Sequence, residues 1–377
     1  MTVLGEASRG QTLGDPTHTP RGYPPPAVRE RPGVMEHQSF TIVGAGAIGA
    51  IVGVHLMRAG HDVVFVEANA DHVAAIRDKG LRLSGVLDAT VMPVVFEPHE
   101  VDGVHSRVFL AVKSRQTESA LAPMVGHLAP DGYVLSLQNG LEEFKIAALV
   151  GELRTIGAFL TFGGFYEGPG HVSFTGKGSL CIGEIDGRVS PRVVELGETL
   201  SALQPVDVTD NIMGYLWAKM ALGAVYFATA TVSADVPEIY DRGIYLKVLG
   251  NLAGEVVDVA TAAGITPEAF DGFDPKVYSL RRPSDPASRA ANWAAQKAYW
   301  IALTQARTGM WRDLAVHHRK TEVDELVGSV SSAAKGHHIA TPRVDALVAI
   351  IHGIENGSRE LGWHNLDSLA ELDRALE

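Results

Sequence analysis

The pattern of apolar and polar positions divides the chain into two stretches of different character. From Phe40 to Val66 an apolar run, a glycine turn, an amphipathic stretch and the apolar run DVVFV follow one another, which is the order of a β-α-β unit. Such a unit requires a parallel sheet with a right-handed crossover. The segments VHSRVFLAVKS and GYVLSLQNG repeat the pattern, and TIGAFLTFGGFYE and GHVSFTGKGSLCIGEI predict an antiparallel or mixed extension of the same sheet.

The remainder of the chain has helical periodicity. Apolar-periodic stretches separated by Gly or Pro signals cover 212–232, 238–263, 288–306, 309–335 and 341–356. We therefore predict an α/β domain at 37–210 and an all-α domain at 211–377. The charged, proline-bearing segment 271–288 is either a lid over a cleft or a solvated connection.

The first 36 residues differ from both stretches. They are crowded with Pro and Gly and have neither a helical nor a strand period, so we predict a disordered leader at 1–36. Met35, which stands just before the first predicted strand, is a candidate natural start.

Composition narrows the class of ligand. A chain of 377 residues that is 46% hydrophobic can bury a substantial core. Its formal charge of −12 disfavours nucleic acid and anionic membranes, which need a basic footprint, and favours a small-molecule ligand. Cys181 is the only cysteine, which excludes an intrachain disulfide and favours the cytoplasm. The sequence contains no uncharged apolar run long enough to predict a membrane span.

Three glycines after the first predicted strand have the spacing G-x-G-x-x-G. Gly44 permits the tight turn, Gly46 lets a pyrophosphate approach the backbone, and Gly49 allows close packing of the helix. The motif between a strand and a helix predicts a Rossmann-type dinucleotide site, and the alternative is a structural turn without a ligand. The residues predicted to contact the cofactor here are Gly44, Ala45, Gly46, Ala47, Ile48 and Gly49.

Glu67 ends the second predicted strand, 18 residues after Gly49. A carboxylate at this place can accept the ribose hydroxyls of NAD and repels the 2′-phosphate of NADP. We therefore predict that NAD(H) is preferred, with NADP(H) possible. The alternative is an exposed acid that caps the following helix.

Lys113 and Asn139 each end a predicted strand, at the edge where ligands of such sheets bind. Lys113 can contact phosphate or ribose, and the amide of Asn139 can lie near both the nicotinamide and the substrate. Solvated loop roles are equally common for residues at strand ends.

Lys219 is the only charge in YLWAKMALGAVYFATATV, a predicted buried helix. Its ammonium must extend to solvent, find a partner or face a cleft. A cleft lysine with a lowered pKa is a suitable general acid toward a carbonyl oxygen that receives hydride. Glu322 lies on a later predicted helix and could pair with this lysine, although a solvated helix face is the usual role of a glutamate.

The histidine pairs at 317–318 and 337–338 could suggest a metal site. Adjacent histidines on a helix point in different directions, and neither a carboxylate nor a cysteine stands at ligand spacing. We predict no metal.

Five ordered motifs and a following segment together resemble the ketopantoate reductase (2-dehydropantoate 2-reductase) family over about residues 40–357. They are IVGAGAIG, LAVKSRQT, SLQNGLEE, LWAKMAL and RDLAVHHRKTEVDELVG, followed by TPRVDAL. The resemblance implies a Rossmann domain joined to a helical domain like that of 6-phosphogluconate dehydrogenase, with the active site between them. It also implies that Lys219 is the general acid, Glu322 its helper, Asn139 the asparagine beside cofactor and substrate, and Lys113 the lysine on the cofactor side.

The sequence departs from this family at several positions. Gly223 stands where the family has an asparagine four residues after the lysine, and Gly309 replaces a serine. The family's NADP-selecting arginine falls at Ala68, directly after Glu67. Because polar groups for ketopantoate are missing, that substrate should bind poorly. Tyr226, Phe227 and Tyr240 suggest a larger or more aromatic substrate; the predicted substrate-binding residues are Asn139, Gly223, Tyr226, Phe227 and Gly309.

We predict an NAD-dependent dehydrogenase or reductase that interconverts a carbonyl and an alcohol on a 2-oxo or 2-hydroxy acid, or on a bulkier ketone or alcohol, rather than ketopantoate. An imine- or opine-type reductase remains an alternative within the same architecture. A non-catalytic NAD-binding redox sensor is the alternative from another class, which the presence of both Lys219 and Glu322 disfavours. The apolar helices suggest a homodimer, although they can equally form a core.

Overall fold

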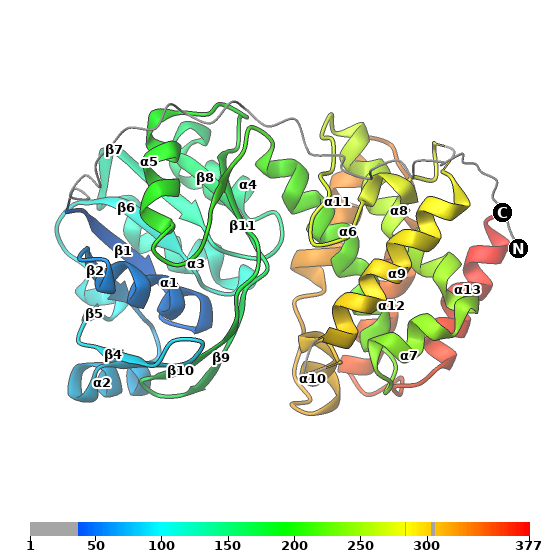
Figure 1. Cartoon of the computed structure of the whole chain (residues 1–377), viewed down its shortest axis with the longest axis horizontal. Coiled ribbons are helices and arrows are strands. Elements are labelled where there is room, and N and C mark those ends of the chain that lie inside the picture. Colours follow the sequence, from blue (N-terminus) through cyan, green and yellow to red (C-terminus); the bar gives the residue numbers. More distant parts are fainter. Residues whose placement is uncertain (1–36, 283, 303–305) are drawn as a thin grey trace, which may run out of the picture. The chain divides into compact units, whose positions relative to one another are not determined.

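A computed structural model describes residues 37–282, 284–302 and 306–377 of the chain (Figure 1). The predicted leader at 1–36, with Met35, and the predicted helical residues 303–305 lie outside the described residues. Residues His37–Glu377 form one compact unit.

Eight strands within the described residues form one sheet in the order β12-β11-β8-β7-β6-β1-β2-β5. In chain order they are β1 (Ser39–Val43), β2 (Asp62–Val66), β5 (Val94–Phe96), β6 (His105–Leu110), β7 (Leu128–Ser136), β8 (Thr155–Leu160), β11 (Leu180–Glu184) and β12 (Asp207–Val208). Neighbouring strands are parallel, except that β8 and β11 are antiparallel. The predicted parallel α/β sheet is confirmed.

Helices cover both faces of this sheet. On one face lie α1 (Ala47–Arg58), α2 (Ala70–Lys79) and α5 (Pro191–Leu200), and on the other lie α3 (Thr117–Val125) and α4 (Glu143–Val150). The short helical turns η1 (Pro98–Glu100), η2 (Ser114–Gln116) and η3 (Glu152–Arg154) connect these elements. Because both faces are covered, the central strands are largely buried, as in β8, whose six residues are all buried.

A second, four-stranded sheet has the order β4-β3-β10-β9. Its strands are β3 (Leu81–Gly85), β4 (Ala89–Val91), β9 (Gly163–Gly168) and β10 (His171–Gly176). The prediction that β9 and β10 extend the main sheet is therefore wrong, whereas β8 and β11 do extend it. β10 pairs with β3 instead, because its buried Val172 and Phe174 pack on the side of α1.

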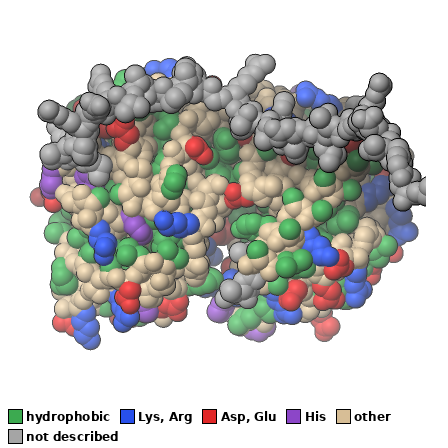
Figure 2. Space-filling model, in the orientation of Figure 1, with side chains coloured by type: hydrophobic (Ala, Val, Ile, Leu, Met, Phe, Trp, Pro, Cys, Tyr) green, Lys and Arg blue, Asp and Glu red, His purple; other side chains and the backbone are tan. Residues whose placement is uncertain are grey.

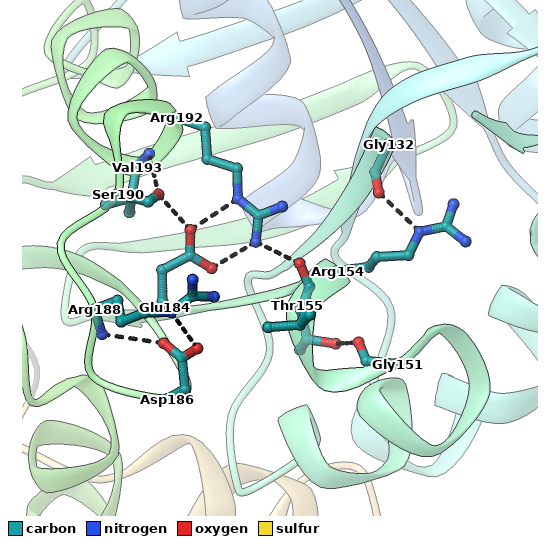
Figure 3. A network of polar contacts seen from close by, with 11 residues as sticks. Gly132, Gly151, Arg154, Thr155, Glu184, Asp186, Arg188, Ser190, Arg192 and Val193 are labelled. Carbon is teal, nitrogen blue, oxygen red and sulfur yellow. Dashed lines mark hydrogen bonds and ion pairs between the residues drawn. The ribbon is translucent and has the colours of Figure 1, made fainter. Parts of the chain in front are cut away.

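The carboxylate of Glu184, at the end of β11, is buried in a network of polar contacts (Figure 3). The guanidinium of Arg192 on α5 donates to it from Nε (2.8 Å) and from Nη2 (2.5 Å), and the Ser190 hydroxyl donates as well. The Ser190 hydroxyl also accepts from Val193 N at the start of α5. The network therefore fixes α5 to the antiparallel edge of the sheet.

The described residues after 210 form helices and the segments that connect them. The helices are α6 (Ile212–Ala230), α7 (Val236–Asp241), α8 (Leu246–Ala262), α9 (Pro286–Ala302), α10 (Gly309–Ala315), α11 (Ser329–Gly336), α12 (Pro342–Glu355) and α13 (His364–Ala375), with the short turns η4 (Gly243–Tyr245), η5 (Pro275–Tyr278) and the π-helical η6 (Asp324–Gly328). The central helix α6 is buried on nearly all sides and packs on α8, as predicted. Within the described ranges no helix is both long and apolar enough to span a bilayer.

A buried charge network joins three helices of this region. The carboxylate of Glu255 on α8 accepts from the backbone amides of Arg343 and Val344, at the start of α12, and from the Arg343 guanidinium at 3.0 Å. Arg343 also donates to Asp373 of α13 at 2.6 Å. The start of α12 is therefore held by a carboxylate, which favourably opposes the positive end of the helix dipole.

One prediction for the helical region is wrong. The predicted helix 309–335 is broken after α10, where His318 has a φ of 49° and Thr321 turns away to donate to Glu355 Oε1. The described residues of the segment 271–288 divide into two parts: Phe273 and Tyr278 are fully buried and stack on each other, whereas Leu280, Arg281, Arg282 and 285–288 are exposed. Whether the segment acts as a lid stays a prediction. Its first residue, Asp271, borders the cavity described below.

The surface carries charges of both signs. Figure 2 shows Lys and Arg side chains interspersed with Asp and Glu side chains over the face in view. Such a mixture is typical of a solvated surface.

Candidate active site

The loop between β1 and α1 owes its shape to two glycines. Gly44 has a φ of +97°, and a Cβ there would lie 2.9 Å from Val112 Cγ1. A Cβ on Gly49 would lie 2.0 Å from the carbonyl oxygen of Gly44. A Cβ on Gly46 would meet nothing within 4 Å. The loop is therefore tightly packed at Gly44 and Gly49 and open at Gly46.

The open side of this loop faces a cavity of about 1420 Å³, which Gly44, Gly46, Ala47 and Ile48 line. The first turn of α1 begins here, and the amides of a first helical turn have no partner within the helix. An anion can therefore be bound by the backbone of the loop. Ala45 is buried and packs behind it.

Glu67 lies at the end of β2 and lines the same cavity. Its Oε2 accepts from the amide of Ala45 at 2.8 Å, and its Oε1 accepts from the amide of Asn69 at 2.8 Å. The side chain thus holds the glycine loop. The predicted contact of Glu67 with a ribose stays a prediction.

His72 is a residue of this site that the sequence did not reveal. Its Nδ1 accepts from the amide of Gly170 at 2.8 Å, so Nε2 carries the hydrogen and donates to the carbonyl of Ala45 at 2.9 Å. The buried ring also packs edge-on against Tyr166 of β9. It therefore ties the glycine loop to the second sheet, and nothing in the local pattern around a lone histidine indicates this.

Lys113 and Ser114, just beyond β6, contact the helical region. The carboxylate of Glu322 accepts from Lys113 Nζ at 2.8 Å and from the amide of Ser114 at 3.1 Å. Glu322 therefore does not contact Lys219 directly, and the suggested pairing of these two side chains is wrong in this respect. The end of β6 offers the carboxylate a cation and an amide together, and two charge-assisted bonds outweigh one.

Lys219 of α6 reaches the sheet instead. Its Nζ donates to Asn139 Oδ1 at 2.8 Å and to the carbonyl of Leu160 at 2.6 Å. Asn139 is itself held, because its carbonyl accepts from the hydroxyl of Ser114. Since an ammonium carries three hydrogens, these two bonds among the described residues leave a third for a ligand in the cavity, which Lys219 lines.

Burial lowers the pKa of the Lys219 ammonium to about 8, because desolvation disfavours its charged form. The carboxylates of Glu143, Asp271 and Glu322 oppose this shift. Glu143 is itself completely buried, and burial raises the pKa of its carboxyl to about 8. The site therefore holds a cation that can release its proton near neutral pH.

The predicted substrate residues all border the cavity. A Cβ on Gly223 or on Gly309 would meet nothing within 4 Å, so both positions leave open space. Tyr226 forms an aromatic wall, standing edge-on to Trp300 and donating to Gln296 Oε1. Phe227 also lines the cavity, although its side chain is fully buried, whereas Tyr240, buried against Trp293, does not line it.

Several contacts of the site come from backbone groups. The carbonyl of Leu160 and the amide of Ser114 have no signature in the sequence. Phe165 of β9 and Arg312 of α10 also line the cavity and contact each other, and only the fold brings them together. No three His, Cys, Asp or Glu side chains within the described part of the chain gather as a metal site.

Comparisons with known proteins agree with this arrangement. The family model described as "Ketopantoate reductase PanE/ApbA" matches residues 40–187, and the model described as "Ketopantoate reductase PanE/ApbA C terminal" matches residues 211–355. The chain is 28% identical to 2-dehydropantoate 2-reductase of Archaeoglobus fulgidus over 326 residues, which cover 86% of this chain and all of that protein.

Solved structures are similar over the same range. A PanE/ApbA family ketopantoate reductase from Ralstonia eutropha JMP134 has a TM-score of 0.70 at 28% identity, covering 85% of this chain and 99% of that one. The ternary structure of D-mandelate dehydrogenase with NADH and anilino(oxo)acetate has a TM-score of 0.73 at 24% identity, covering 85% and 98%. The second likeness concerns the fold alone.

Proposed function

We propose a reaction for this chain, which belongs to the ketopantoate reductase family and is an oxidoreductase acting on CH–OH groups. The reaction is NAD(H)-dependent hydride transfer between the nicotinamide and the carbonyl or alcohol carbon of a 2-oxo or 2-hydroxy acid that is bulkier than ketopantoate. The observation that carries the proposal is the ammonium of Lys219, which Asn139 and Leu160 hold at the cavity wall.

The residues around the glycine loop fit a dinucleotide. The open space at Gly46 and the unpaired amides of a first helical turn suit a diphosphate. Glu67 would bind the adenosine ribose, while Lys113 and Asn139 would lie toward the nicotinamide end. The bound cofactor supplies a hydride in the reductive direction.

Lys219 supplies the proton. As hydride reaches the carbonyl carbon, the C=O π pair moves onto oxygen, and a proton of Nζ is transferred to that oxygen to give the alcohol. Neutral Lys219 then regains a proton from solvent. In the oxidative direction the neutral amine acts as the base. Asn139 and the Leu160 carbonyl orient Nζ for both steps.

Glu67 supports the preference for NAD(H). Its carboxylate is fixed by two backbone amides, so a 2′-phosphate at the ribose would meet a like charge. Arg77, a possible counterion, is already committed to the Val95 carbonyl and to Glu100. We expect kcat/KM with NADH to exceed that with NADPH at least about tenfold. A preference for NADPH would overturn this part of the proposal.

The open positions at Gly223 and Gly309 and the aromatic wall at Tyr226 support a bulky substrate. A structural neighbour was solved with anilino(oxo)acetate, an aryl-bearing 2-oxo acid derivative. Phenylglyoxylate is therefore the first probe, and ketopantoate is the comparison. We expect the higher kcat/KM for phenylglyoxylate.

Replacing the lysine tests the proposal. Lys219→Ala should lower kcat about 10²- to 10⁴-fold and leave the Kd for NADH within about twofold. Lys276→Ala, on an exposed lysine of the helical region that pairs with Glu268, is the matched control. Turnover by Lys219→Ala close to that of the control would show that Lys219 is not the general acid.

Two further expectations stay predictions. The homodimer is checked by light scattering of the purified chain. The cytoplasmic location is checked by fractionation of the producing cell.

A further inference from the structure

A contact between the sheet region and the helical region borders the cavity. The guanidinium carbon of Arg312, on α10, lies 4.8 Å from the centre of the Phe165 ring, on β9. Both residues line the cavity that the glycine loop also lines. A guanidinium stacked on an aromatic ring keeps its donors in its own plane, where they can bind a phosphate.

The position of β9 places this contact beside α1. A Cβ on Gly164 would lie 3.6 Å from Ala47 Cβ and 2.6 Å from Ile51 Cδ1. β9 can therefore pass directly over the first turn of α1 only because residue 164 is glycine. Phe165 follows next in the strand and lines the same cavity as Gly46 and Ala47, so the Arg312 guanidinium stacked on it borders the cavity that the first turn of α1 also borders.

The charges near the first turn of α1 favour a cation that would neutralise a bound diphosphate. The first turn of α1 contains no charged side chain, and the acids Glu67 and Glu167 line the same cavity. Lys113 is engaged by Glu322. A diphosphate carries two negative charges that backbone amides alone do not neutralise.

We infer that Arg312 is a cofactor-binding residue, which places its guanidinium on the diphosphate of the dinucleotide while Phe165 holds the guanidinium in position. This inference rests on the proposed function in one respect, namely that the cavity binds a nicotinamide dinucleotide. It assigns a cofactor contact to the helical region, whereas the sequence placed that region's roles in substrate binding and proton transfer.

Binding measurements test the inference without turnover. NADH is titrated by its own fluorescence at low ionic strength, and ADP-ribose, which has the diphosphate but no nicotinamide, is titrated by competition. Arg312→Met should raise the Kd of both ligands about 10- to 100-fold and should reduce the salt dependence of binding. Phe165→Leu keeps the charge and removes the platform, so it should raise both Kd values by a smaller factor.

Arg307→Met is the matched control. Arg307 lies in the same region, also stacks on an aromatic ring (Trp311, 4.2 Å) and pairs with Asp235, but it does not line the cavity. Its removal costs the same unit of charge, and we expect Kd values within about twofold of the unmodified chain.

Three results would overturn the inference. In the first, Arg312→Met matches Arg307→Met in NADH affinity. In the second, it weakens the binding of NADH but not of ADP-ribose. In the third, it leaves both Kd values unchanged and raises KM for phenylglyoxylate, which would make Arg312 a ligand of the substrate carboxylate. A chain that binds NADH through Arg312 but reduces no oxo acid would refute the proposed reaction and keep the inference. A chain that binds neither NADH nor ADP-ribose would refute both.

Discussion

Glycine serves opposite purposes in the two regions of the site. In the sheet region, a Cβ on Gly44 or Gly49 would strike atoms at 2.9 Å or 2.0 Å. In the helical region, a Cβ on Gly223 or Gly309 would meet nothing within 4 Å. Gly44 and Gly49 are needed because their surroundings leave no room for a side chain. Gly223 and Gly309 leave open space that a ligand can occupy. Glycines of the first kind should be indispensable to the fold, and glycines of the second kind should be replaceable.

The largest effect is expected at Gly49. Gly49→Ala places a methyl group against the backbone oxygen of Gly44, which cannot rotate away. We expect a loss of about 3 kcal/mol in the free energy of unfolding and at least about a 100-fold weaker NADH complex. Urea unfolding and fluorescence titration measure these quantities.

Gly46→Ala is the matched control for this variant. Its methyl group has open space, so stability should change by less than about 0.5 kcal/mol, while NADH binding should weaken because the methyl occupies the cofactor's side of the loop. Equal free energies of unfolding for Gly46→Ala and Gly49→Ala would show that close packing does not make glycine necessary at residue 49.

We expect the helical region and the sheet region to differ also in how much a buried acid contributes to the free energy of unfolding. Glu255→Gln leaves Arg343, which is 9% exposed, with only part of its charge balanced, and we expect a loss of about 3 kcal/mol in unfolding free energy. Glu184→Gln in the sheet region should cost about 1 kcal/mol, because Arg192 is 29% exposed and water can replace part of the lost bond. A larger loss for Glu184→Gln would reverse this ranking.

Gly223→Asn tests the open space directly. Because nothing lies within 4 Å of the position, the side chain should fit with less than about 0.5 kcal/mol lost in stability. The ratio of kcat/KM for ketopantoate to that for phenylglyoxylate should rise about 10- to 100-fold. Gly309→Ser should act in the same direction with a smaller factor. An unchanged ratio in both variants would show that neither glycine sets the substrate.

The smallest expected effect is on pH dependence. Lys219 must be protonated for reduction, and its pKa is lowered to about 8. The kcat/KM for reduction should therefore be constant below pH 8 and fall about tenfold per pH unit above it. For oxidation the profile should be reversed.

We expect the replacement of one acid from each region to shift the pH profile of kcat/KM by different amounts. Glu143, in the sheet region, raises the pKa of Lys219 more than Asp271 of the helical region does. Glu143→Gln should therefore shift the descending limb to lower pH by about half a unit, and Asp271→Asn by less. A shift to higher pH in either variant would contradict the assigned direction of the coupling.

The sequence predicted what local pattern determines. The β-α-β unit and its glycines follow from spacing, because the turn and the strand–helix contact need those residues at those positions. The buried helix around Lys219 follows from its uninterrupted apolar run. The edge where Lys113 and Asn139 lie follows from the rule that parallel strands end on the same side.

What the sequence did not predict depends on distant partners. The separate pairing of β9 and β10 needs β3, about ninety residues earlier in the chain. The break after α10 needs the Glu355 carboxylate that Thr321 reaches. The His72 ring bonds to backbone groups of Ala45 and Gly170, and Leu160 acts through its own carbonyl. Every residue has such backbone groups, so they leave no pattern in the sequence.

Cys181 gives the chain an internal reporter of its own unfolding. It is the only thiol in the sequence, it lies buried on β11, and burial raises its pKa to about 12. At pH 8 a maleimide should therefore react only with molecules that have opened around β11, since the thiolate is the reactive form. The rate of labelling would then measure how often the native protein opens, without denaturant and without the addition of any probe residue.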